Sequence, residues 1–167
     1  MGADKEFTIF HFDDELESVQ WLARAVMIRF RDERRDLRVK KISETESDEE
    51  YIYKFSVDDL IFTYWIVSNQ KAALKQFRPT DKDLLFLDIN VYGAGGTLLL
   101  QGFHLLDEFK KSISTNRIFI VSCALSQLGN RHTGLKPDHL IHKPLDVSVI
   151  QQIVAEHFFQ YMPPSKK

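Results

Sequence analysis

The sequence contains a single cysteine, Cys123, among its 167 residues. One thiol excludes an internal disulfide framework and is typical of a reducing compartment, so we expect a cytoplasmic location. No apolar run approaches the roughly 18 residues that a membrane-spanning helix needs, and residues 1–6 lack the apolar core of a signal peptide. We therefore expect no insertion into a membrane.

An excess of charge of one sign is also missing. The chain has 22 Lys and Arg residues against 24 Asp and Glu residues, for a formal net charge of −2. Proteins that bind nucleic acid usually carry a basic face or stripe, so we expect no direct binding of nucleic acid. The length and the apolar content of 44% fit one domain with a full core. We assign residues 1–167 to this single, stand-alone domain.

Short apolar runs alternate with helical patterns along the chain. Runs with the composition of buried strands occupy residues 7–12, 60–67, 84–87, 118–121 and 140–141. Helical spacing of apolar residues is found over residues 15–30, 69–77, 103–113 and 146–158. Strands that are apolar on both faces and alternate with helices indicate a parallel sheet covered on both sides. We predict an α/β fold of the flavodoxin-like, doubly wound class, with five parallel strands in the order 2-1-3-4-5.

Two segments interrupt this alternation. Between the first helix and the second strand, residues 31–59 contain two strand-like stretches around an acidic run at residues 44–50. We predict a β-hairpin or arm there, with a disordered loop as the alternative because charge runs usually stay solvated. The second segment is an enlarged loop over residues 91–102, and residues 162–167 form a tail.

Four of the apolar runs end in polar residues that do not belong in a core. These residues are Asp13 and Asp14, Asp88, Ser122, and Lys143. In a parallel sheet such positions share the carboxyl edge, where open α/β sheets bind ligands. We therefore expect the five side chains to lie in one crevice.

The chemistry of this set is coherent. Three carboxylates at close quarters repel one another, and a hard divalent cation such as Mg²⁺ compensates their charge through oxygen ligands. A carboxylate can also act as a nucleophile and form an acyl phosphate. Phosphoryl transfer depends mainly on positioning and on stabilisation of the charged oxygens. A lysine ammonium and a serine hydroxyl are suited to bind those oxygens.

At these residues the sequence resembles the receiver domains of response regulators in two-component signalling. The matching segments are Phe12-Asp13-Asp14-Glu15, Leu85-Phe86-Leu87-Asp88-Ile89-Asn90, Ile120-Val121-Ser122 and His142-Lys143-Pro144. The resemblance covers residues 7–159 apart from the insertions. It implies that Asp88 is the phosphoacceptor and that Lys143 and Ser122 bind the phosphoryl group. It also implies that Asp13, Asp14, Asp88 and the backbone carbonyl of Asn90 hold Mg²⁺, and that the Lys143-Pro144 bond is cis.

The sequence departs from the pattern of this family at several positions. Leu140 stands where the family has an aromatic switch residue, and Cys123 stands where a small alanine is usual. Val91-Tyr92-Gly93 replaces the usual Met-Pro pair, and 74 positions separate Asp14 from Asp88, a long interval for the family. The familiar coupling of a hydroxyl shift to an aromatic rotation is therefore not expected to carry over unchanged.

The resemblance implies a signalling switch. A histidine kinase or a histidine phosphotransfer protein would donate the phosphoryl group, and a downstream protein target would bind the altered surface. We expect no enzymatic turnover beyond self-phosphorylation from a donor and autodephosphorylation.

Two other functions stay open. A degenerate receiver would act as a phosphorylation-independent docking module, which Leu140 and the enlarged loop favour. A metal-dependent phosphohydrolase with an aspartyl nucleophile would need Asp-x-Asp-x-Thr after the first strand, where residues 13–17 read Asp-Asp-Glu-Leu-Glu.

Overall fold

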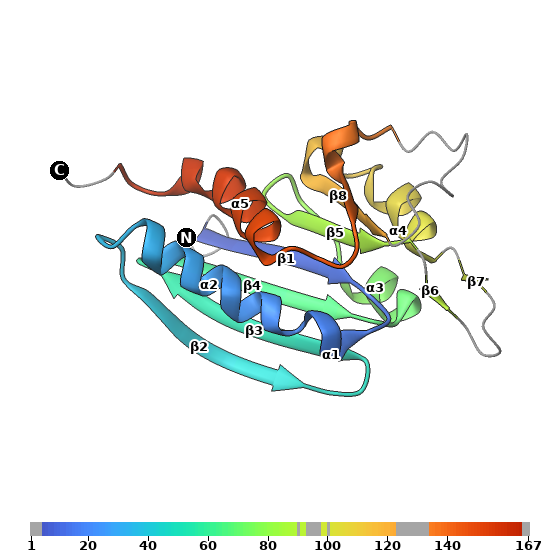
Figure 1. Cartoon of the computed structure of the whole chain (residues 1–167), viewed down its shortest axis with the longest axis horizontal. Coiled ribbons are helices and arrows are strands. Elements are labelled where there is room, and N and C mark those ends of the chain that lie inside the picture. The colour runs from blue at the N-terminus through green and yellow to red at the C-terminus, as the bar shows by residue number, and fades with distance from the viewer. Residues whose placement is uncertain (1–4, 90, 93–97, 100, 123–133, 165–167) are drawn as a thin grey trace.

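The computed structural model describes residues 5–89, 91–92, 98–99, 101–122 and 134–164. These residues form an α/β fold around a seven-stranded mixed sheet with the order β2-β3-β4-β1-β5-β8-β9, shown in Figure 1. Two short strands, β6 (Val91–Tyr92) and β7 (Leu98–Leu99), pair antiparallel as a separate ribbon within the predicted loop at 91–102. The predicted α/β class is confirmed.

Parallel pairing joins the strands that the apolar runs predict. These strands are β1 (Glu6–Phe12), β4 (Leu60–Val67), β5 (Leu84–Asp88), β8 (Ile118–Ser122) and β9 (Leu140–His142). Every residue of β5 and β8 is buried, because helices cover both faces of the sheet. In the register of β1, Phe12 lies opposite Val67 on one side and Leu87 on the other, so the carboxyl ends of these strands lie level with one another.

The insertion is part of the sheet. Strands β2 (Val39–Glu46) and β3 (Glu50–Val57) form an antiparallel hairpin, and β3 also pairs antiparallel with β4. This confirms the predicted hairpin and excludes the disordered loop. It also makes the prediction of a five-stranded parallel sheet wrong, because the whole sheet has seven strands of mixed direction, with β3 and β2 added beyond β4. The physical reason is that every second residue of β3 is apolar and is buried only when β3 extends the sheet.

The edge strand β2 is exposed along nearly its whole length. A register shift between Lys41 and Ser43 places a β-bulge at Ile42. Bulges and charged side chains at an open edge hinder pairing with a further strand, so this edge has the usual protection of exposed sheets.

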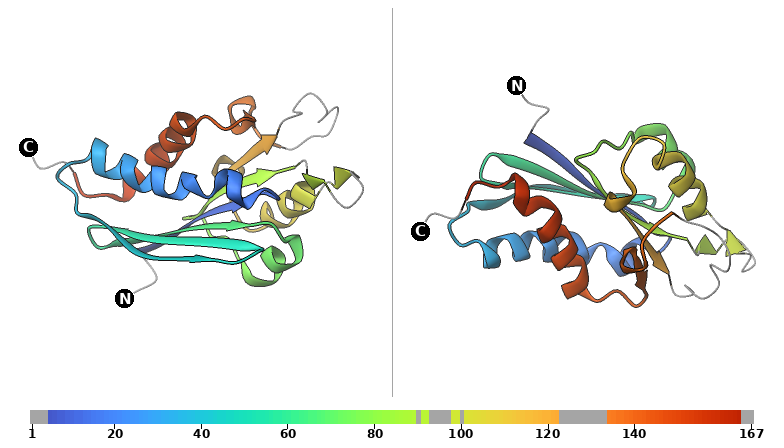
Figure 2. Two further views of the ribbon diagram at one scale, coloured as in Figure 1. Left: turned by 60° about the horizontal axis from the view of Figure 1, so that its bottom comes forward. Right: turned by 90° about the horizontal axis from the view of Figure 1, so that it is seen from above.

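Helices cover the two faces of the sheet in separate groups, as Figure 2 shows. The group on one face consists of α1 (Leu16–Val19), α2 (Trp21–Glu33) and α5 (Val147–Phe158), whereas α3 (Gln70–Gln76) and α4 (Gln101–Phe109) cover the other. The single helix predicted over residues 15–30 is thus two helices in the structure, α1 and α2, which are divided at Gln20.

Two helices have a side-chain cap at their N-terminus. The side chain of Asn69 accepts a hydrogen bond from Ala72 N at the start of α3, and that of Asp146 accepts one from Ser148 N at the start of α5. The described residues also include the short 3₁₀ turns η3 (Thr115–Arg117), η5 (Pro137–His139) and η6 (Phe159–Tyr161).

Each face has its own aromatic core. Phe7, Phe62 and Phe158 pack together under α2 and α5, with the rings of Phe7 and Phe62 stacked at 5.2 Å. On the opposite face, the rings of Phe10 and Phe77 stack at 4.5 Å under α3 and α4. None of the helices in the described part of the chain has both the length and the apolarity to cross a membrane.

The last turn of α5 is anchored by a neutral histidine. The Arg117 guanidinium, which is always charged, donates to His157 Nε2 at 2.8 Å and to the Tyr161 hydroxyl at 3.1 Å. Burial, together with the charge of Arg117, lowers the pKa of His157 from 6.5 to about 4. The unfolded chain therefore takes up a proton between pH 6.5 and 4 that the folded protein does not bind.

This difference predicts a loss of stability on acidification. We expect the free energy of unfolding to be about 1–2 kcal/mol lower at pH 4.5 than at pH 7 on account of His157, whose partial exposure reduces the effect. Urea unfolding at both pH values measures this dependence in the wild type and in His157→Gln. The carboxyl groups contribute equally to both proteins, so an identical pH dependence in the two would contradict the prediction.

Candidate functional site

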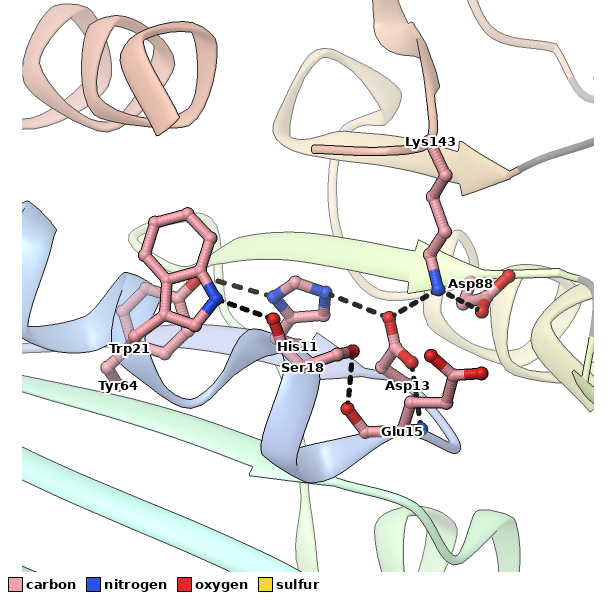
Figure 3. Close-up of polar contacts among 8 residues, drawn as sticks. All are labelled: His11, Asp13, Glu15, Ser18, Trp21, Tyr64, Asp88 and Lys143. Carbon is pink, nitrogen blue, oxygen red and sulfur yellow. Dashed lines mark hydrogen bonds and ion pairs between the residues drawn. The ribbon is translucent and has the colours of Figure 1, made fainter. Parts of the chain in front are cut away.

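Polar side chains gather at the carboxyl edge of the parallel strands. Asp13 and Asp14 follow β1, Asp88 is the last residue of β5, and Lys143 follows β9. The structure brings these four residues together, and Figure 3 shows three of them, Asp13, Asp88 and Lys143, pointing toward one another. The predicted meeting of polar residues from separate strands is thus confirmed for this set.

Asp13 is fully buried and held by the backbone around it. Its own N–H donates to the carbonyl of Val67, which continues the pairing of β1 with β4. Its Oδ1 accepts from the backbone N–H of Glu15 at 3.0 Å, and this turn directs the chain into α1. Asp13 Oδ1 is therefore engaged by the turn, whereas Oδ2 faces the crevice.

Lys143 bridges two of the carboxylates. Its Nζ lies 2.8 Å from Asp13 Oδ2 and 2.8 Å from Asp88 Oδ2, and the side chain is only 16% exposed. The backbone N–H of Lys143 donates to the carbonyl of Ser122, which ties the segment after β9 to the end of β8. The Lys143-Pro144 bond is cis, as predicted.

The charges at the site stabilise one another. Burial by itself would lower the pKa of Lys143, but the carboxylates of Asp13 and Asp88 outweigh it and raise this pKa above its ordinary value. Burial by itself would raise the pKa of Asp13, but the neighbouring His11 ring and the Lys143 ammonium hold it below its usual range. At neutral pH the site therefore combines an ammonium with an ionised Asp13.

The three carboxylates fit a hard divalent cation. Asp13, Asp14 and Asp88 each offer an oxygen, and these oxygens all lie within 4.8 Å of one another. Two of the three residues are buried, and one ammonium cannot neutralise three carboxylates. Oxygen donors in such a set suit Mg²⁺, which takes one or two carboxylates and fills its other positions with water or phosphate oxygens. The backbone carbonyl of Asn90, the fourth predicted ligand, lies outside the described residues.

The remaining residues that the sequence singled out lie in different surroundings. Ser122 is fully buried at the end of β8, on the strand next to β5 and paired with His142 of β9. Cys123 lies outside the described residues. Leu140 is partly buried and packs against the core under α3 and α4, as an apolar side chain is expected to do.

Reasoning from the sequence missed Gly102, in the first turn of α4. A Cβ at this position would lie 2.1 Å from the carbonyl oxygen of Asp88 and 2.8 Å from the Cα of Ile89. The helix approaches the backbone of Asp88 this closely only because Gly102 has no side chain. A glycine next to a helical pattern is a sequence signal for such an approach, but it does not identify the partner.

His11 was missed as well. It is the only non-apolar residue among the four buried residues 9–12 of β1, and it is fully buried. Its Nδ1 lies 3.2 Å from the hydroxyl of Tyr64, and its Nε2 lies 3.8 Å from Asp13 Oδ2. Burial, with the charge of Asp13, raises the pKa of Tyr64, so this hydroxyl stays protonated.

A surface cavity opens beside Lys143. Its volume is about 410 Å³, and its lining combines α1, the start of α2 and the segment after β9. Trp21, which is 46% exposed, and Leu145 make part of the wall apolar. The crevice with the carboxylates thus has an apolar surface next to it.

In the comparisons with known proteins, no family model and no curated protein matches this chain. A functional conclusion therefore depends on the geometry of the site.

Proposed function

We propose that this protein is a receiver-type signalling switch, which accepts a phosphoryl group on Asp88 with Mg²⁺ held by Asp13, Asp14 and Asp88. The observation that carries this proposal is the position of Lys143, whose ammonium lies 2.8 Å from both Asp13 and Asp88 at the edge of the sheet. A cation at this point can contact a phosphoryl oxygen on Asp88 without a change of backbone.

The reaction would form one bond and break one bond. A carboxylate oxygen of Asp88 attacks the phosphorus of a phosphohistidine, the new O–P bond forms, and the P–N bond breaks with its electron pair left on the donor's imidazole. Lys143 balances the charge on one phosphoryl oxygen, and the Ser122 hydroxyl donates to another. Mg²⁺, when bound by the three carboxylates, neutralises charge on the phosphoryl oxygens.

The fold supports the proposal. Counted among themselves, the parallel strands run β4-β1-β5-β8-β9, which is the flavodoxin-like order 2-1-3-4-5 with the hairpin added at one edge. Ligands of such sheets bind outside the carboxyl ends of the strands, where the carboxylates lie. The donor would be a histidine kinase or a phosphotransfer protein, and the output a downstream protein in the cytoplasm.

A docking module that works without phosphorylation is the second candidate. The observation in its favour is the pair of ion pairs that Lys143 makes with Asp13 and Asp88, because they link the segment after β9 to β1 and β5. In that case the three carboxylates and Lys143 would serve only to hold β1, β5 and β9 together.

Incubation with Mg²⁺ and acetyl phosphate separates the two candidates. We expect intact-mass spectrometry to detect one added phosphoryl group in the wild type and in Asp107→Asn, a change at an exposed carboxylate of α4, but none in Asp88→Asn. Beryllofluoride with Mg²⁺ should shift amide NMR signals around Asp88 in the first two proteins only. The absence of modification and of Mg²⁺-dependent shifts in the wild type would rule out the switch and favour the docking module.

A further inference from the structure

A histidine and a tyrosine lie beside Asp13, in the core on the face of the sheet that α1, α2 and α5 cover. His11 of β1 and Tyr64 of β4 are both 0% exposed. His11 Nδ1 is 3.2 Å from the hydroxyl of Tyr64. His11 Nε2 has no hydrogen-bond partner within the described part of the chain, and it faces Asp13 Oδ2 at 3.8 Å, as Figure 3 shows. A buried ring nitrogen without a partner is costly, so this orientation needs a reason.

The charges around the ring determine where its proton lies. A neutral imidazole has one donor nitrogen and one acceptor nitrogen. A proton on Nδ1 would leave the lone pair of Nε2 facing the carboxylate of Asp13, which is repulsive. A proton on Nε2 instead directs an N–H at the carboxylate and lets the Tyr64 hydroxyl donate to Nδ1. Of the two neutral forms, only the second is favourable at both ends of the ring.

We infer that His11 is a positioning residue for Asp13, with its Nε2–H directed at Oδ2 and its ring held in place by Tyr64. Asp13 Oδ1 is already engaged by the N–H of Glu15, at 3.0 Å. The His11 ring restrains the other carboxylate oxygen, Oδ2, from the core side. Oδ2 therefore stays directed at Lys143 and at a cation. The part that concerns the cation rests on the proposed function, whereas the position of the ring proton does not.

A purely structural role makes a different prediction. The ring of His11 also packs near Phe86, at 5.7 Å between ring centroids, so a phenylalanine at position 11 should fill the same space. If His11 only fills the core, its replacement by Phe would leave the affinity for Mg²⁺ unchanged. If His11 positions Asp13, the same replacement should weaken Mg²⁺ binding by about tenfold, the lower end of the effect of outer-shell partners.

The first measurement uses the metal-free wild-type protein labelled with ¹⁵N. Long-range ¹H–¹⁵N correlation spectra of the histidine rings report which nitrogen carries the proton. We expect Nε2 of His11 to be protonated. An unprotonated Nε2 would overturn the inference, whatever the protein does with Mg²⁺ or phosphate.

The second measurement is a Mg²⁺ titration followed by amide chemical shifts. We expect the dissociation constant to rise about tenfold in His11→Phe and by a smaller factor in Tyr64→Phe. Tyr53→Phe serves as the matched control, because it removes another buried tyrosine hydroxyl from the same sheet, in β3. Far-UV circular dichroism and thermal unfolding confirm that each variant is folded.

The outcomes separate the inference from the proposed function. Equal Mg²⁺ affinity in the wild type and His11→Phe would overturn the inference while the switch stands. A wild type that binds no Mg²⁺ would overturn the metal part of the inference together with the proposed function. The ring proton of His11 would then still decide whether the histidine is directed at Asp13.

Discussion

Replacement of Lys143 by methionine is expected to lower the free energy of unfolding at pH 7 by about 3–5 kcal/mol. The Lys143 ammonium lies 2.8 Å from Asp13 Oδ2 and from Asp88 Oδ2, and both carboxylates are at most 1% exposed. Methionine keeps most of the unbranched side chain but removes the charge, so two buried carboxylates lose their cation. Urea unfolding measures the loss. Lys136→Met, at an exposed lysine before η5, should change the stability by less than about 0.5 kcal/mol.

The loss should depend on pH in a defined direction. In the wild type the pKa of Asp13 is lowered, so its contribution is present at neutral pH and is lost on acidification through that pKa. In the variant, Asp13 loses the part of this lowering that Lys143 supplies, while the His11 ring still opposes the effect of burial. A carboxyl group whose pKa is lowered less contributes less stability at neutral pH, and the difference disappears once the group is protonated in both proteins. The stability difference between the two proteins should therefore shrink as the pH falls toward and below 3.8, the ordinary pKa of an aspartate.

A divalent cation should offset the same loss. If the three carboxylates bind Mg²⁺, millimolar Mg²⁺ should raise the melting temperature of Lys143→Met more than that of the wild type, because a bound cation replaces the missing ammonium. A penalty that changes neither with pH nor with Mg²⁺ would show that the loss is one of packing rather than of charge.

The second large effect is expected at Gly102. Alanine normally stabilises a helix relative to glycine by about 0.5–1 kcal/mol. In α4, however, the Cβ of Gly102→Ala would lie 2.1 Å from the carbonyl oxygen of Asp88, a backbone atom that cannot rotate away. We expect the variant to be less stable by about 2–3 kcal/mol, the upper range of overpacking effects. The sign of the change is thus opposite to that of an ordinary Gly-to-Ala substitution.

The same substitution should affect the proposed chemistry. Relief of the contact requires α4 or the end of β5 to move, and either movement displaces Asp88 relative to Lys143. We expect slower labelling by acetyl phosphate in Gly102→Ala, whereas His104→Ala, at an exposed position two residues further along α4, should leave both stability and labelling near the wild type. A Gly102→Ala protein that is more stable than the wild type would show that α4 adjusts without cost.

Several features of this protein follow from the sequence because they depend on local pattern. Runs that are apolar at every position, such as those that become β5 and β8, predict strands covered on both faces, and the alternation with helices then favours parallel pairing. Parallel pairing places the residues after each strand at one edge. For that reason the meeting of Asp13, Asp88 and Lys143 was predictable before any coordinates were known.

Other features depend on contacts between segments far apart in the chain, and only the tertiary structure decided them. The β2-β3 hairpin was predicted from its composition, but its place beside β4 depends on burial of the β3 side chains against α2 and the rest of the sheet. The close approach of Gly102 to Asp88 and the alignment of His11 between Tyr64 and Asp13 are likewise contacts between separate elements. Periodicity and residue type determine which faces are buried and which residues reach an edge, whereas distances of a few ångströms are set by the packing of the whole chain.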